Sequence, residues 1–125
     1  MHDDEPERLD RATILALRAL RRPDGTNALS RLVPIFLSNA ETNILAARAA
    51  LAGGDLIALN ATAHAMKSSS GSIGAPRLAS MWNDLDTATD PRLPPGQDVA
   101  GLLTAIKREF ALVADDLRAE LGLPG

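Results

Sequence analysis

The sequence predicts an all-α protein, an antiparallel four-helix bundle with an additional short helix at its N-terminal end. Apolar residues recur at steps of three and four positions in each long segment, and no segment shows the alternation of a half-buried strand. The hydrophobic content is 46% and consists mostly of Ala and Leu, which favour helices. Short connections rich in Gly and Pro separate the segments, as expected for neighbouring antiparallel helices.

The first helix is expected over residues 8–22. It ends in Arg-Arg-Pro-Asp-Gly, and basic residues followed by Pro and Gly are a typical helix stop signal. The residues that recur there at helical spacing are Leu9, Thr13, Ala16, Leu17 and Leu20.

A long second helix is expected to end at Gly53-Gly54. Pro34 lies inside it and cannot donate a hydrogen bond to the carbonyl of Ser30, so a kink is expected near the start of the helix. The apolar stripe comprises Val33, Leu37, Ala40, Ile44, Ala47 and Leu51, widened by Leu29, Leu32 and Phe36.

The third helix is expected over residues 56–71, with Asp55 as its N-cap. Gly74 is expected to end the turn that follows, and Pro76 suits the first turn of the fourth helix. The apolar positions of the fourth helix are Leu78, Met81, Trp82 and Leu85, and those of the last helix are Val99, Leu103, Ile106, Phe110, Val113 and Leu117.

The chain is interpreted as one bundle domain over residues 8–121. Residues 1–7 are acidic and polar, so a flexible arm is expected there, and a flexible tail is expected at residues 122–125. The short acidic arm fits either a free protein or the terminal piece of a longer chain.

The composition excludes several classes of protein. A net charge of -3 without a basic block argues against a nucleic-acid binder. No apolar run approaches the roughly 18 residues that membrane insertion needs, and the acidic N-terminal segment is not a signal peptide. There is no cysteine, which excludes disulfides and thiolate metal sites. A cytoplasmic protein is therefore expected.

The third helix has one polar face around a single histidine. On a helical wheel Leu59, Ala63, Met66 and Ser70 gather on the side expected to face the core. The residues expected on the solvent side are His64, Asn60, Lys67, Ser68 and Gly71, together with Ile57.

Several chemistries fit this face poorly. A single His on a helix surface is most often a solvated side chain. The only other His is His2, so no metal site is expected. The serines lie four or more residues from His64 and no carboxylate is placed to orient it, which disfavours a hydrolase. Lys67 precedes the glycines, so the stretch is not a nucleotide-binding loop, and Gly74 is interpreted as a turn.

Covalent phosphoryl transfer fits the face better. A neutral imidazole is a good nucleophile near pH 7. Lys67 lies three positions after His64 and supplies a mobile cation, and the small Ser68 and Gly71 leave room for a partner.

The stretch resembles the histidine-containing phosphotransfer (HPt) domain of bacterial phosphorelays. The family pattern is roughly His-x-x-Lys-Gly-x-Ser/Ala-x-x-x-Gly-x-x-x-Leu. The residues in register here are His64, Lys67, Ser70, Gly74 and Leu78. The upstream stretch "RLVPIFLSNAETNILAARAALAGGD" resembles the family's long second helix. Two residues depart from the pattern: Ser68 stands in place of the usual Gly, and Asp86, expected on an outer face, replaces a frequent Glu.

The resemblance implies a phosphorelay intermediate. His64 would accept a phosphoryl group from the aspartyl phosphate of one receiver domain and pass it to another. The implied partners are response-regulator receiver domains and a sensor or hybrid histidine kinase. No cofactor is expected in this chain, because the receiver would bring the Mg²⁺. The chain would be a carrier without a nucleotide site or kinase activity of its own.

The resemblance also assigns supporting roles. Lys67 would stabilise the phosphoryl charge, Asn60 and Ser68 would assist it, and Ile57 would belong to an apolar docking ring. Two alternatives remain open: a helical-bundle interaction module that binds a receiver or kinase without using His64, and a purely structural bundle.

Overall fold

The computed structural model describes residues 8–93 and 98–123, and the described part is all-α. The arm predicted at residues 1–7 and the end of the tail, residues 124–125, lie outside the described residues. The helices are α1 (Arg11–Ala19), α2 (Ala28–Ala52), α3 (Leu56–Ser72), α4 (Pro76–Ala88) and α5 (Val99–Glu120).

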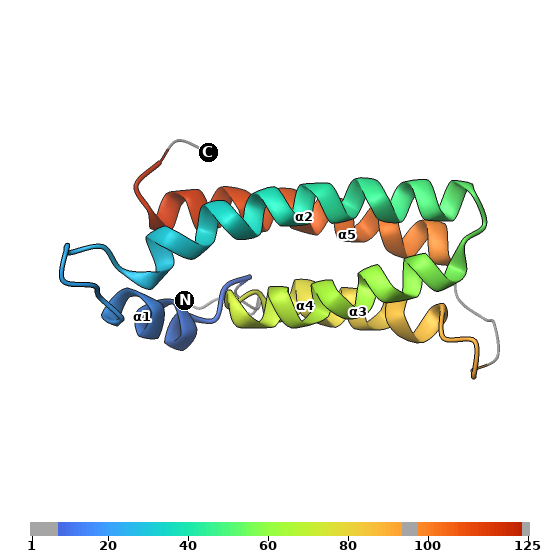
Figure 1. Cartoon of the computed structure of the whole chain (residues 1–125), viewed down its shortest axis with the longest axis horizontal. Coiled ribbons are helices and arrows are strands. Elements are labelled where there is room, and N and C mark those ends of the chain that lie inside the picture. Colours follow the sequence, from blue (N-terminus) through green and yellow to red (C-terminus); the bar gives the residue numbers. More distant parts are fainter. Residues whose placement is uncertain (1–7, 94–97, 124–125) are drawn as a thin grey trace, which may run out of the picture.

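Helices α2 to α5 form the predicted antiparallel bundle, and α1 is the additional short helix (Figure 1). In Figure 1, α2 and α5 make the upper layer, α3 and α4 make the lower layer, and α1 lies at one end. The most extensive packing is between α3 and α4, followed by α2 against α3 and α4 against α5. The fold class expected from the sequence is confirmed.

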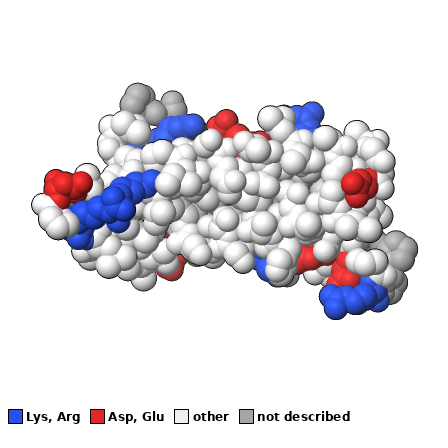
Figure 2. All heavy atoms as spheres, in the orientation of Figure 1, with Lys and Arg blue, Asp and Glu red and all other residues white. Residues whose placement is uncertain are grey.

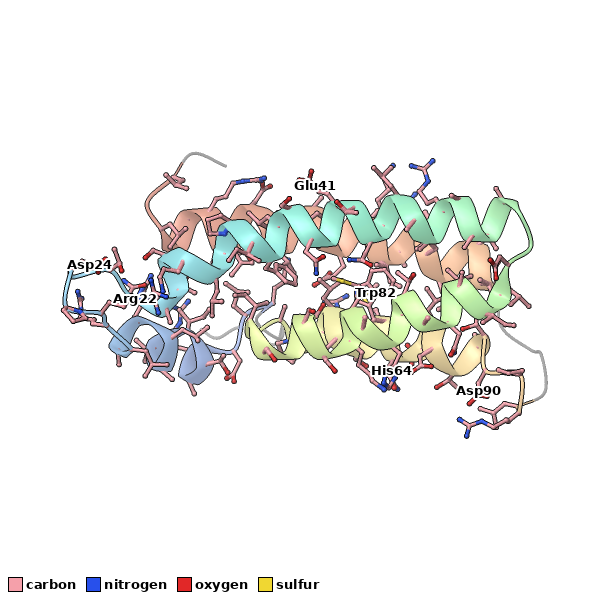
Figure 3. All side chains as sticks on the ribbon, viewed as in Figure 1. Arg22, Asp24, Glu41, His64, Trp82 and Asp90 are labelled. Carbon is pink, nitrogen blue, oxygen red and sulfur yellow. The ribbon has the colours of Figure 1, made fainter. Side chains whose placement is uncertain are left out.

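The core lies between the two layers and is mainly aliphatic. Trp82 is fully buried at its centre (Figure 3). Phe36 of α2 and Phe110 of α5 bridge the upper layer, with ring centroids 6.3 Å apart. Helix α2 continues through Pro34 from Ala28 to Ala52. The expected stripes of α2, α4 and α5 are buried or half-buried, except Leu32, which is 40% exposed.

Helix α1 is shorter than the predicted residues 8–22. The backbone after Ala19 leaves the helix because Ala28 N–H donates to the carbonyl of Leu20 at 2.8 Å. Arg22 N–H likewise donates to the carbonyl of Thr26 at 2.9 Å, so this segment forms a turn. The predicted stripe was also wrong in part. It included Leu20, which is 60% exposed, and left out Ile14, which is fully buried.

The turn between α3 and α4 receives the N-terminal segment. Gly74 has a φ of +90°, which glycine adopts readily, and its carbonyl accepts from the N–H of Asp10 at 2.7 Å. A Cβ at Gly74 would lie 3.1 Å from the side chain of Thr13. The turn predicted at Gly74 is confirmed, and the structure adds that α1 packs against it.

The other helix ends follow ordinary capping rules. Asp55 caps α3 as predicted, accepting from Ala58 N–H at 3.0 Å. Past α5, Leu123 N–H donates to the carbonyl of Arg118 at 2.9 Å, with Gly122 at a φ of +75° between them. The domain bounds 8–121 and the flexibility of the tail stay predictions.

Candidate functional site

Helix α3 has the orientation that its sequence predicts. Leu59, Ala63, Met66 and Ser70 are all fully buried. The side chain of His64 is 70% exposed and points away from the bundle, as Figure 3 shows. Because both ring edges of a solvated imidazole are equally available, the neighbours of its nitrogens decide its chemistry.

A carboxylate from α4 lies beside the histidine. Nδ1 of His64 is 3.3 Å from Oδ2 of Asp86, whose side chain is 19% exposed. The expectation that no carboxylate is placed to orient this histidine was wrong. Asp86 was also expected on an outer face, but the close packing of α3 on α4 brings it to the edge of the site. Asp86 is therefore a candidate site residue that the sequence did not lead us to expect.

The environment of Asp86 keeps it ionised. Burial raises the pKa of its carboxyl group, but hydrogen bonds from His64, Lys67 and Asn60 outweigh this and hold the pKa below its ordinary value of 3.8. An ionised carboxylate only accepts hydrogen bonds, so Nδ1 of a neutral His64 is the donor. Nε2 then carries the free lone pair.

Lys67 lies on the same side of Asp86. Its Nζ is 3.2 Å from Oδ2 of Asp86 and 3.4 Å from Oδ1 of Asn83. The side chain is 34% exposed, so water has access to the ammonium group. The ammonium group is therefore next to the imidazole and able to turn towards a group bound there.

Asn60 is occupied by α4 rather than turned towards solvent. Its Nδ2 lies 2.8 Å from both Oδ1 and the main-chain oxygen of Asp86, and 3.1 Å from Oγ1 of Thr89. The amide thus contacts Asp86 at Oδ1, whereas His64 contacts it at Oδ2.

Of the remaining predicted residues, Ser68, Gly71 and Ile57 are exposed on α3, and Gly74 follows the helix. Ser68 and Gly71 are exposed, and no neighbour lies within 4 Å of where a Cβ at Gly71 would stand. Ile57 is 79% exposed, the largest exposed fraction among the large apolar side chains of the described residues. Gly74 lies in the turn beyond the site and is buried. The structure therefore brings Lys67 to His64 and leaves Ile57 unburied.

The face formed by α2 and α3 is poor in charge. Lys67 is the only charged residue of α3. Figure 2 shows that charged side chains gather at the ends and edges of this face and leave its centre uncharged. An apolar groove of about 180 Å³ lies between the two helices, lined by Leu32, Ile35, Phe36, Asn39, Ser69, Ser72 and Ile73.

The described residues contain neither a metal-binding cluster nor a membrane-spanning helix. No group of three or more His, Asp or Glu side chains there is arranged to hold a metal ion. Likewise, none of the helices in residues 8–93 and 98–123 is long and apolar enough to cross a membrane.

Comparison with known proteins decides the family. The model of the Hpt domain matches residues 31–119, which include the whole of α3 and α4. The chain belongs to the Hpt domain family. Its general role is histidine phosphotransfer in two-component phosphorelays, whose partners are receivers and kinases. Family members are phosphocarriers rather than kinases.

A solved structure agrees with this membership. Histidine-containing phosphotransfer protein B (HptB) from Pseudomonas aeruginosa PAO1 has a TM-score of 0.80 and 27% sequence identity, over 93% of this chain and 96% of that chain. No curated protein sequence matched the chain. The Hpt match begins within α2, so α1, which contacts Gly74, lies outside it.

Proposed function

We propose that this Hpt domain is a phosphorelay intermediate that carries a phosphoryl group on Nε2 of His64. The group would come from the aspartyl phosphate of one receiver domain and pass to the aspartate of another. The observation that carries the proposal is the contact between Nδ1 of His64 and Asp86, because it leaves Nε2 as the exposed nucleophilic nitrogen.

The transfer step is balanced without a further reactant. The lone pair of His64 Nε2 forms the N–P bond while the P–O bond to the receiver's aspartate breaks and that carboxylate leaves. His64 keeps its proton on Nδ1, so positive charge develops on the ring. The carboxylate of Asp86, 3.3 Å away, stabilises that charge. The reverse step follows the same path.

Lys67 would act directly on the phosphoryl group. Its ammonium group leaves Asp86 and approaches the phosphoryl oxygens, where negative charge is highest. Ser68 lies one turn after His64, so its hydroxyl group is within reach of the same oxygens. Its side chain also takes up more space than the Gly usual in the family, and Gly71 leaves the next turn open.

The receiver would dock across the uncharged face of α2 and α3. Ile57 and the groove that includes Ile35 supply apolar surface there. The Mg²⁺ of the reaction would arrive with the receiver's acidic pocket, so this chain would need no cofactor and no nucleotide site. Such a role places the chain with its receivers in the cytoplasm.

A relay experiment tests the proposal. A receiver domain labelled on its aspartate is mixed with this chain and a second receiver that does not exchange label with the first. Label is expected to appear on this chain and then on the second receiver. Binding of both receivers without any label on this chain would instead favour the alternative function, an interaction module that does not use His64.

A further inference from the structure

The two carboxylate oxygens of Asp86 have separate partners. Oδ2 lies 3.3 Å from Nδ1 of His64 and 3.2 Å from Nζ of Lys67. Oδ1 lies 2.8 Å from Nδ2 of Asn60. Oδ2 therefore contacts the two side chains of the site, and Oδ1 is hydrogen-bonded to Asn60.

Asn60 is itself held by the end of α4. Its Nδ2 also reaches the main-chain oxygen of Asp86 at 2.8 Å and Oγ1 of Thr89 at 3.1 Å. Thr89 is only 4% exposed and donates its own hydroxyl proton to the carbonyl of Leu85 at 2.7 Å. The lone pairs of Oγ1 are then free to accept from Asn60. The Thr89 hydroxyl group is buried and takes part in two hydrogen bonds, so it gives Asn60 a fixed anchor.

The anchor matters when the phosphoryl group arrives. In the proposed function Lys67, whose Nζ is 3.2 Å from Oδ2 and whose side chain is 34% exposed, turns towards the phosphoryl oxygens. A carboxylate that followed Lys67 would bring its negative charge towards the same oxygens and would also leave Nδ1 of His64 without its acceptor. Asp86 must therefore stay in place while Lys67 moves.

We propose that Asn60 is a positioning residue. It holds Oδ1 of Asp86 against the end of α4, so that Oδ2 keeps His64 oriented while Lys67 is released to the phosphoryl group. This inference rests on the proposed function. It gives Asn60 a role different from the direct assistance of the phosphoryl group that the sequence led us to expect.

The test compares Asn60→Ala with the matched control Asn43→Ala. Asn43 lies on α2, and among the described residues its side chain donates only to Asn39 of the same helix, so the control removes an amide without touching the site. Potassium phosphoramidate serves as the phosphoryl donor because it needs no partner protein: His64 Nε2 forms the N–P bond as ammonia leaves. Asn60→Ala is expected to slow the phosphorylation of His64 about tenfold, and Asn43→Ala to leave the rate unchanged.

A second readout separates positioning from a general structural effect. The ¹⁵N chemical shifts of the His64 ring, recorded in a pH series up to the plateau where they no longer change, report which nitrogen holds the proton. The wild-type chain is expected to show mainly the Nδ1–H form, and Asn60→Ala a larger share of the Nε2–H form. Thr89→Val, which removes the anchoring hydroxyl group, is expected to shift the ring in the same direction.

The outcomes are distinct. An unchanged rate, or a slower rate with an unchanged tautomer ratio and a lower melting temperature, would overturn the positioning role of Asn60. A wild-type chain that takes no phosphoryl group from phosphoramidate or from any receiver would refute the proposed function instead. The tautomer ratio would still decide whether Asn60 orients His64 through Asp86.

Discussion

The carboxylate of Asp86 on α4 lies 3.3 Å from Nδ1 of His64 on α3. This contact turns an exposed histidine into an oriented one, because it leaves Nε2 as the nitrogen that faces solvent. It also makes the packing of two helices part of the chemistry.

Asp86→Asn is expected to slow phosphoryl transfer to His64 about tenfold, because the amide retains the shape but loses the charge that stabilises the ring. The measurement is the single-turnover rate with a labelled receiver. Asp84→Asn, two positions earlier on the same helix and exposed, is the control and is expected to transfer at the wild-type rate. Equal rates for the two variants would remove Asp86 from the mechanism.

Lys67→Ala is expected to reduce the same rate about tenfold, because a charge-assisted contact with the phosphoryl oxygens is lost. The chain offers a matched control, since its only other lysine, Lys107, is exposed on α5. Lys107→Ala is expected to have no effect. If Lys67→Ala lowered the helical content measured by circular dichroism and left the rate unchanged, the role of Lys67 would be structural.

Ile57→Asp is expected to weaken receiver binding about tenfold or more, because a charge would be desolvated in the contact. The melting temperature is expected to change little, since Ile57 is 79% exposed. Leu112→Asp, on α5 and 44% exposed, is the control for an added charge at an apolar surface position. Titration of a receiver against each variant gives the answer, and equal affinities would exclude Ile57 from the docking surface.

Gly74→Ala is expected to lower the free energy of unfolding by about 1–3 kcal/mol, because a Cβ at a φ of +90° is strained and would press on Thr13. Gly71→Ala is the control. Gly71 lies inside α3 with open space around it, so alanine is expected to be neutral or to stabilise by up to about 1 kcal/mol. Urea unfolding of both variants checks this pair, and a Gly74→Ala variant as stable as the wild type would contradict the strain.

The ion pairs between α1 and α5 are expected to weaken in acid. Hydrogen bonding from Arg11 is the main cause that lowers the pKa of Glu120 below its ordinary value of 4.5, with further help from Arg18. A carboxyl group whose pKa is lower in the folded state than in the unfolded state stabilises the fold at pH values above its unfolded-state pKa. This contribution is lost as the pH falls through its folded-state pKa. Glu120→Gln is therefore expected to cost up to about 1 kcal/mol at pH 7.

That cost is expected to disappear as the pH falls well below 4.5, where wild-type Glu120 is also neutral. The measurement is urea unfolding at several pH values. Asp115→Asn is the control, because Asp115 is 59% exposed and its ion pair with Arg118 is 3.7 Å long. A difference between Glu120→Gln and the wild type that did not depend on pH would contradict this linkage.

The sequence predicted most of the fold because helical periodicity reports which side of each helix meets the core. Leu59, Ala63 and Met66 set the phase of α3 and so placed His64 in solvent, as the structure confirms. The same signal was weak for α1. That helix has only nine residues, and the backbone groups after Ala19 form the hydrogen bonds of a turn instead of continuing the helix.

The site was harder to predict because it depends on two helices. Lys67 follows His64 on the same helix face, so spacing alone was enough to find it. Asp86 is 22 residues away on α4. Helical periodicity shows which side of α4 faces the core, but not which of its residues contact α3. The ion pair between the nearly buried Glu109 of α5 and Arg77 of α4, with Oε1 3.8 Å from Nε, could not be predicted from the sequence for the same reason.

The most direct test of the proposed function is the position of the label after transfer from a phosphorylated receiver domain. The wild-type chain is expected to carry label that is labile in acid and stable in alkali, as a phosphoramidate is, and to carry it on Nε2 of His64. His64→Gln is expected to carry none while it still binds the receiver. Undiminished label on His64→Gln would contradict the assignment of His64 as the phosphoryl carrier.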